Sequence, residues 1–187
     1  MKSPSGSAGK SGFTLLEMMI VVVIIGLVAA LAYPQYQIVS RANLRETSRK
    51  LAGTIRYIYA RSIMDKKPWR LAFDMDKNQV WAERLEPRTD GPGNEYVMAK
   101  LGSLKKIALP EGVMIRDVKV LGREASQQGV EYIYFTPYGG VERAVVHLVH
   151  ENHRWVFSLV TKPLSGRVAI FDYDVDIERE PMEGDGI

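Results

Sequence analysis

The chain has 187 residues, 25 lysines and arginines against 22 acidic residues, and no cysteine. This length suits one domain with an additional segment and not two full domains, and the missing cysteines exclude a disulfide scaffold and a lipid-modified cysteine. Lys2 and Lys10 account for two of the three formal positive charges, so the basic pI gives no reason to expect general polyanion binding.

An apolar run from Phe13 to Tyr33 follows twelve small and polar residues, MKSPSGSAGKSG. A helix of this length spans roughly 30 Å, the thickness of the hydrocarbon core of a bilayer. Glu17 is the single ionisable side chain of the run before Tyr33, and a carboxylate in lipid costs about 2.5–3.5 kcal/mol, so we infer a functional role for it. Small residues precede the run, which favours a retained signal anchor over a cleaved secretory signal peptide.

The hexapeptide Gly12-Phe13-Thr14-Leu15-Leu16-Glu17, with Lys10 upstream, resembles the N-terminal motif of the type IV pilin and type II secretion pseudopilin superfamily. The resemblance implies that a prepilin peptidase cleaves between Gly12 and Phe13 and that Phe13 is N-methylated. It also implies that Glu17 neutralises the N-terminal amine of a neighbouring subunit during filament assembly. Such a pair is favourable at low dielectric, where either charge alone is costly. The alternative is an ordinary single-span anchor with an incidental glutamate.

The resemblance further places a helix kink at Gly26 and Pro34. Beyond Pro34 the pattern predicts that the helix continues to about Lys66, because Pro68 disfavours helical geometry before it. One apolar stripe runs along this continuation, with the basic residues largely off it. The stripe consists of Leu44, Leu51, Ile55, Ile58 and Ile63.

After residue 68 the apolar residues recur with a period of two instead of the helical period. It predicts strands at 69–74, 79–86, 113–121 with a slip at Asp117, 131–135, 144–150, 154–159 and 167–172. Residues 87–103 predict a long exposed loop, because they are rich in Gly, Pro, Asn and Asp. Short turns between the last four strands predict antiparallel neighbours. One long helix packed on antiparallel sheet gives the α+β class with a pilin-like architecture.

Three later motifs carry a finer resemblance, to the H-type pseudopilins (GspH-like) and the related FimT and FimU minor pilins. They are Phe135-Thr136-Pro137-Tyr138-Gly139-Gly140, Trp155-Val156, and Leu164-Ser165-Gly166-Arg167-Val168, with the helix motif YARS at 59–62. Ser165 stands where family versions often have threonine. The resemblance implies a minor pseudopilin of a type II secretion system, with other pseudopilins, a prepilin peptidase and inner-membrane lipid as partners. The alternative is a minor pilin of a type IV pilus that takes part in DNA uptake.

We therefore expect a prepilin leader at 1–12, a transmembrane and assembly helix at 13–33, an amphipathic continuation at 34–67 and a β-rich domain at 68–187. The resemblance implies a single-pass inner-membrane protein with a cytoplasmic N-terminus and a periplasmic C-terminal domain. Charge alone does not decide the orientation, since basic residues flank both ends of the apolar run.

A search for chemistry gives no convincing catalytic constellation, so we expect no enzymatic role, no cofactor and no metal. His147, His150 and His153 are three residues apart, but in a strand this spacing alternates faces and favours structural roles. Asp172, Asp174 and Asp176 would share one strand face, where they could hold a hard cation or protect a sheet edge.

Residues 172–187 hold seven acidic side chains and Arg179 as their one cation, which argues against nucleic acid as a partner.

Overall fold

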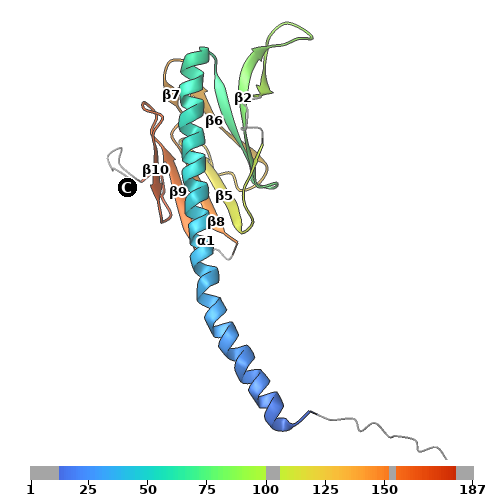
Figure 1. Ribbon diagram of the computed structural model, residues 1–187. Coiled ribbons are helices and arrows are strands. Elements are labelled where there is room, and N and C mark those ends of the chain that lie inside the picture. The colour runs from blue at the N-terminus through green and yellow to red at the C-terminus, as the bar shows by residue number, and fades with distance from the viewer. Residues whose placement is uncertain (1–12, 100–105, 152–154, 180–187) are drawn as a thin grey trace, which may run out of the picture. The chain divides into compact units, whose positions relative to one another are not determined.

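A computed structural model describes residues 13–99, 106–151 and 155–179; for residues 30–40 it describes the backbone and not the side chains. The chain divides into two compact units, Met1–Val39 and Ser40–Ile187 (Figure 1). The described residues form one α-helix and ten β-strands, and all strands belong to the second unit.

Helix α1 runs from Leu15 to Asp65 and passes through Pro34 without a break, as the sequence predicts. It ends in a Schellman motif: Lys67 N–H donates to the Ser62 carbonyl, and Lys66 N–H donates to the Ile63 carbonyl, both at 3.3 Å. Lys66 takes the left-handed conformation, with φ of 53°, that this motif requires. The predicted end near Lys66 is therefore confirmed, whereas the kink at Gly26 and Pro34 stays a prediction.

The part of α1 within the second unit buries one face against the sheets. Leu44, Leu51, Ile55 and Ile58 are at most 1% exposed and belong to one continuous core cluster. Ile63 is 40% exposed, so its predicted place on the buried stripe is wrong. Small hydroxyl residues fill the rest of the buried face and bond back to carbonyls four residues earlier, which satisfies them without leaving the helix.

A six-stranded antiparallel sheet has the order β3-β2-β1-β6-β7, with β4 also pairing with β2. Its strands are β1 (Trp69–Asp74), β2 (Gln79–Pro87), β3 (Asn94–Met98), β4 (Ile107–Ala108), β6 (Val130–Thr136) and β7 (Gly140–Val141). The hairpin predicted around DMDKN is confirmed, and Asn78 closes its turn at a φ of 52°. Asparagine tolerates this left-handed geometry better than most residues.

A four-stranded antiparallel sheet has the order β10-β9-β8-β5. Its strands are β5 (Val113–Val120), β8 (Ala144–His150), β9 (Val156–Thr161) and β10 (Val168–Phe171). The register of β5 on β8 shifts between Ile115 and Asp117, which confirms the predicted slip. Every residue of β8 is buried, so this sheet is covered on both faces. Residues of α1 and both sheets form the main core on one side, and Val145 and Val160 belong to a second, smaller apolar cluster.

Two expectations about the strands are wrong. Residues 94–98, predicted as loop, form β3. Tyr96 and Val97 pair with Leu85 and Arg84 of β2 and so add a strand to the sheet, although the neighbouring residues are typical of turns. Strands 131–135 and 144–150, predicted as neighbours, lie in different sheets. The TPYGG turn instead leads into the two-residue strand β7, and the chain then crosses to the second sheet.

Candidate functional site

The candidate assembly segment begins at Phe13, whose side chain is 74% exposed. The Thr14 hydroxyl accepts a hydrogen bond from the backbone N–H of Glu17, and the Thr14 carbonyl accepts one from Met18, both at 3.2 Å. A threonine followed three residues later by glutamate has the spacing of a capping box, which satisfies N–H groups left unpaired in the first turn. Thr14 therefore fixes the start of α1 and places Glu17 in the first turn with its side chain exposed.

Large apolar side chains are exposed all along this first part of α1. They are Phe13, Leu15, Leu16, Met18, Met19, Ile20, Val21, Val22, Val23, Ile24, Ile25, Leu27 and Val28, each at least 40% exposed. Within the described residues, no helix has both the length and the apolar character needed to cross a membrane. Residues 30–33 of the expected membrane segment are among those whose side chains the structure does not describe.

Of the two residues of the expected processing site, the structure describes Phe13. Gly12 lies outside the described residues, so cleavage between Gly12 and Phe13 and methylation of Phe13 stay predictions. The role of Glu17 in pairing with a neighbouring amine also stays a prediction.

Tyr59 and Ser62, in the YARS motif of α1, hold two turns of the domain in place. The Tyr59 hydroxyl donates to the Gly139 and Leu164 carbonyls at 3.1 and 3.2 Å, and so shares its proton between the TPYGG and TKPLSG turns. The Ser62 hydroxyl lies 3.1 Å from the Thr136 carbonyl. Three of the four motifs, YARS and the two turn motifs, therefore meet at the C-terminal end of α1, whereas Trp155 lies beside Arg41.

The three aspartates predicted to line a strand face lie beyond the end of β10, so the edge-strand expectation is wrong. Each instead forms an ion pair within its own unit: Arg41 with Asp172 (3.1 Å), Arg116 with Asp174 (2.6 Å) and Lys119 with Asp176 (3.4 Å). The hydrogen bond from Arg116 lowers the pKa of Asp174 below its ordinary value. We call residues 172–179 the C-terminal strap.

A row of buried polar side chains lies beneath the strap. Asp117, His147 and Ser158 stand opposite one another on β5, β8 and β9, and we call them the polar row. His147 Nδ1 is 2.6 Å from Asp117 Oδ1, and His147 Nε2 is 3.1 Å from the Val175 carbonyl. His147 Nε2 also lies 3.1 Å from an Asp174 carboxylate oxygen, so both ring nitrogens face hydrogen-bond acceptors.

Burial raises the pKa of Asp117, but hydrogen bonds from His147 and Arg116 outweigh burial and bring this pKa below its ordinary value. Asp117 is therefore a carboxylate held between the His147 ring and the Arg116 guanidinium.

The residue types of the polar row are those of a nucleophilic triad, but their hydrogen bonds differ. The Ser158 hydroxyl donates to the Tyr173 carbonyl at 2.6 Å and accepts from the Val175 N–H at 3.1 Å. His147 faces the Val175 carbonyl through the nitrogen that would serve as a base. The row thus binds main-chain groups of the strap. The linear sequence gives no sign of it, because strand register alone brings these residues together.

The three histidines, for which the sequence favours structural roles, are described only in part. Among the described residues, no group of three histidine, cysteine or acidic side chains could hold a metal ion. His147 and His150 are both buried, at 4% and 5% exposure, and His153 lies outside the described residues.

A cluster of three tyrosines surrounds Arg70 on the six-stranded sheet. The Arg70 guanidinium carbon lies 4.1, 4.0 and 6.0 Å from the ring centroids of Tyr96, Tyr132 and Tyr134. Arg70 also forms an ion pair with Glu83 at 2.6 Å, so both its charge and its flat faces are engaged within the unit.

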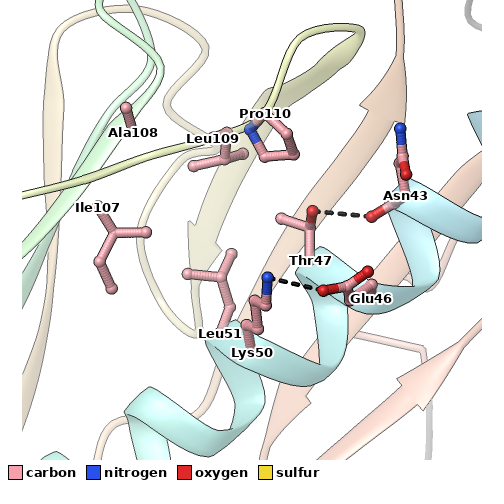
Figure 2. A pocket seen from close by; sticks show the side chains of 9 residues that line it. All are labelled: Asn43, Glu46, Thr47, Lys50, Leu51, Ile107, Ala108, Leu109 and Pro110. Carbon is pink, nitrogen blue, oxygen red and sulfur yellow. Dashed lines mark hydrogen bonds and ion pairs between the residues drawn. The ribbon is translucent and has the colours of Figure 1, made fainter.

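Figure 2 shows a shallow pocket between α1 and residues 107–110, with a cavity volume of about 290 Å³. Lys50 and Glu46 pair with each other at 2.7 Å on one side, and Thr47 donates to the Asn43 carbonyl at 2.8 Å. Leu51 faces Ile107 and Leu109 across the pocket. The volume lies at the small end for ligand sites, and its polar groups are directed to each other and not toward a bound molecule.

Comparison with known proteins gives one match to an N-terminal motif and a second to the fold. Residues 7–33 match the model of the prokaryotic N-terminal methylation motif. The fold is similar to a structure of the minor pseudopilin EpsH from the type II secretion system of Vibrio cholerae, with a TM-score of 0.52 at 12% identity, over 70% of this chain and 97% of that chain. A crystal structure of the same protein gives a TM-score of 0.50 at 10% identity, over 62% and 89%.

The chain therefore combines a prokaryotic N-terminal methylation motif with a pilin-like fold. The α+β, pilin-like fold class predicted from the sequence is confirmed. Within this class the fold is similar to that of a minor pseudopilin of a type II secretion system, and at 10–12% identity this is a likeness of fold.

Proposed function

We propose that this chain is a minor pseudopilin, a structural subunit of the periplasmic pseudopilus of a type II secretion system. The observation that carries the proposal is the exposed apolar helix directly behind the methylation motif, joined to a domain with a minor-pseudopilin fold. In this role the protein acts through assembly with other pseudopilins and not through catalysis.

Prepilin peptidase would cleave between Gly12 and Phe13, and the new N-terminus would be methylated. The first part of α1 would anchor the protein in the inner membrane before assembly, with the C-terminal unit in the periplasm. The supporting observation is the unbroken set of exposed apolar side chains, since such a surface is stable in lipid or against other helices and not in water.

Glu17 would pair with the N-terminal amine of a neighbouring subunit. Its exposed side chain can reach outward, because the Thr14 hydroxyl already caps the helix through the Glu17 backbone N–H. In an apolar surround, the pair is stabilised by low dielectric, and loss of either partner leaves an uncompensated charge.

Processing is tested by expressing the full chain with and without a prepilin peptidase and measuring the mass of the N-terminal peptide. We expect loss of residues 1–12 and a methyl group on Phe13 with the peptidase. Retention of Met1 in both strains would contradict the proposal.

Assembly is tested with Glu17→Ala and, as a matched control, Glu46→Ala. Glu46 is another exposed glutamate of α1, and it pairs with Lys50 within its own helix. We expect Glu17→Ala to be cleaved normally but to be lost from crosslinked filaments and to reduce secretion, while Glu46→Ala behaves as wild type. Equal incorporation of the two variants would remove the role given to Glu17.

A DNA mobility-shift experiment separates this function from that of a DNA-binding minor pilin. Arg116 and Lys119 are already paired with acidic residues of the strap, which leaves them poorly placed to bind phosphate. We expect no salt-sensitive binding of duplex DNA, and tight binding would favour the type IV pilus alternative.

A further inference from the structure

The C-terminal strap lies on the outer face of the four-stranded sheet, yet it is not one of the sheet's strands. Val175 and Ile177 are 2% and 1% exposed and pack on Val145 and Val160, with Phe171 against the same cluster. In the described residues, no strand ladder joins the strap to the sheet. The strap is therefore held as a bound peptide would be, by side chains of the surface beneath it.

The polar row recognises the strap's backbone. Ser158 bonds the Tyr173 carbonyl and the Val175 N–H, and His147 bonds the Val175 carbonyl. Asp117 orients His147 from the other side. These contacts pair with main-chain groups, and His147 Nε2 also lies 3.1 Å from the Asp174 carboxylate, so the row recognises an extended backbone together with an acidic side chain.

Charges and apolar contacts give this surface a sequence preference. Arg116 makes a two-point hydrogen bond to the Asp174 carboxylate at 2.6 and 3.1 Å. Lys119 pairs with Asp176 at 3.4 Å and with Glu178 at 3.0 Å. Acidic residues thus alternate with the buried Val175 and Ile177, and each kind of side chain meets its complement on the sheet.

We propose that this face of the four-stranded sheet is a binding site for an extended peptide of alternating acidic and apolar residues, filled in cis by the strap and open to a partner segment of the same chemistry. The supporting argument for the occupant is charge complementarity, with Arg116 and Lys119 opposite the acidic positions and Val145 and Val160 opposite the apolar ones. The proposal does not depend on the filament role.

The test measures binding of a fluorescent synthetic peptide, FDYDVDIER (residues 171–179), to the full-length protein in detergent by anisotropy. The double variant Val175→Asp/Ile177→Asp releases the strap and leaves the sheet intact. We expect this variant to bind the peptide at least tenfold more tightly than wild type, because the cis occupant no longer competes. A matched peptide with both apolar residues changed to Asp should not bind.

Adding Arg116→Glu/Lys119→Glu to the released variant should weaken peptide binding at least tenfold. Equal affinity of wild type and the released variant would overturn the proposal, as would binding that ignores the charge reversal.

Hydrogen exchange on the wild-type protein provides a test that needs no variant. We expect the Val175 amide, which donates to the Ser158 hydroxyl, to exchange at least tenfold faster than the ladder amides of β8 and β9, because the strap opens while the sheet stays folded. Equal protection of strap and ladder would show that the strap cannot leave on its own, and the proposal would fail.

Discussion

Gly166 allows a sharp test of how the TKPLSG turn is held against α1. Its φ is +61°, and a Cβ placed there would lie well under 3.0 Å from three ring carbons of Tyr59. Gly122 has a φ of +81° with nothing within 4 Å of its Cβ position, so it is a matched control for the backbone alone.

Gly166→Ala and Gly122→Ala should lower the free energy of unfolding by clearly different amounts. A Cβ in the left-handed region costs about 1–2 kcal/mol, which is the whole expected effect at Gly122. At Gly166, overpacking adds about 1–3 kcal/mol. Displacing the ring also weakens the Tyr59 hydroxyl contacts to two carbonyls, each worth about 0.5–1.5 kcal/mol. If both hydrogen bonds are lost, these contributions sum to about 3–8 kcal/mol.

Urea unfolding of a fragment that begins at Ser40, followed by circular dichroism, measures both variants. In a Tyr59→Ala background, the cost of Gly166→Ala should fall to that of Gly122→Ala, since the clash partner is gone. If Gly166→Ala costs no more than Gly122→Ala in the wild-type background, the Tyr59 contact does not hold the turn as described.

Three further outcomes follow from burial and charge. Asp117→Asn leaves His147 and Arg116 without their carboxylate and should cost about 3–5 kcal/mol in the same unfolding assay. The pKa of Asp117 is lowered from its ordinary value of 3.8, so its contribution to stability is present above pH 3.8 and is lost as the pH falls through the folded-state pKa. The unfolding free energies of wild type and Asp117→Asn should therefore converge at low pH. Ile55→Ala should cost about 2–5 kcal/mol, and Ile63→Ala less than about 1 kcal/mol, because Ile55 is fully buried and Ile63 is 40% exposed.

Features decided by neighbouring residues could be predicted from the sequence. The end of α1, the hairpin around DMDKN and the slip at Asp117 all depend on local periodicity, on a proline or on turn residues. The prediction failed at Ile63 because it lies five residues after Ile58, about 140° around the helix from it, whereas Ser62 at the four-residue spacing is fully buried.

Features decided by distant partners could not be predicted. Asp172, Asp174 and Asp176 alternate as in a strand, but cations far away in the sequence give them the geometry of a strap instead. Strand register likewise assembles the polar row from three separate strands. The candidate assembly segment is a different case. Its motif is wholly local, so it could be recognised from the sequence, and the structure adds the Thr14 cap.

The two units differ in what they leave unburied. The second unit buries most of its large apolar side chains, whereas thirteen large apolar side chains between Phe13 and Val28 remain 40–79% exposed. At about 1.5–3 kcal/mol for complete burial of each, covering what is exposed is worth roughly 10–25 kcal/mol. That is comparable with the typical folding stability of a domain, about 5–15 kcal/mol, and the proposed function predicts that the first unit gains it by association. Substitutions in the second unit should therefore be read in unfolding experiments, and substitutions in the first unit in partition and assembly experiments.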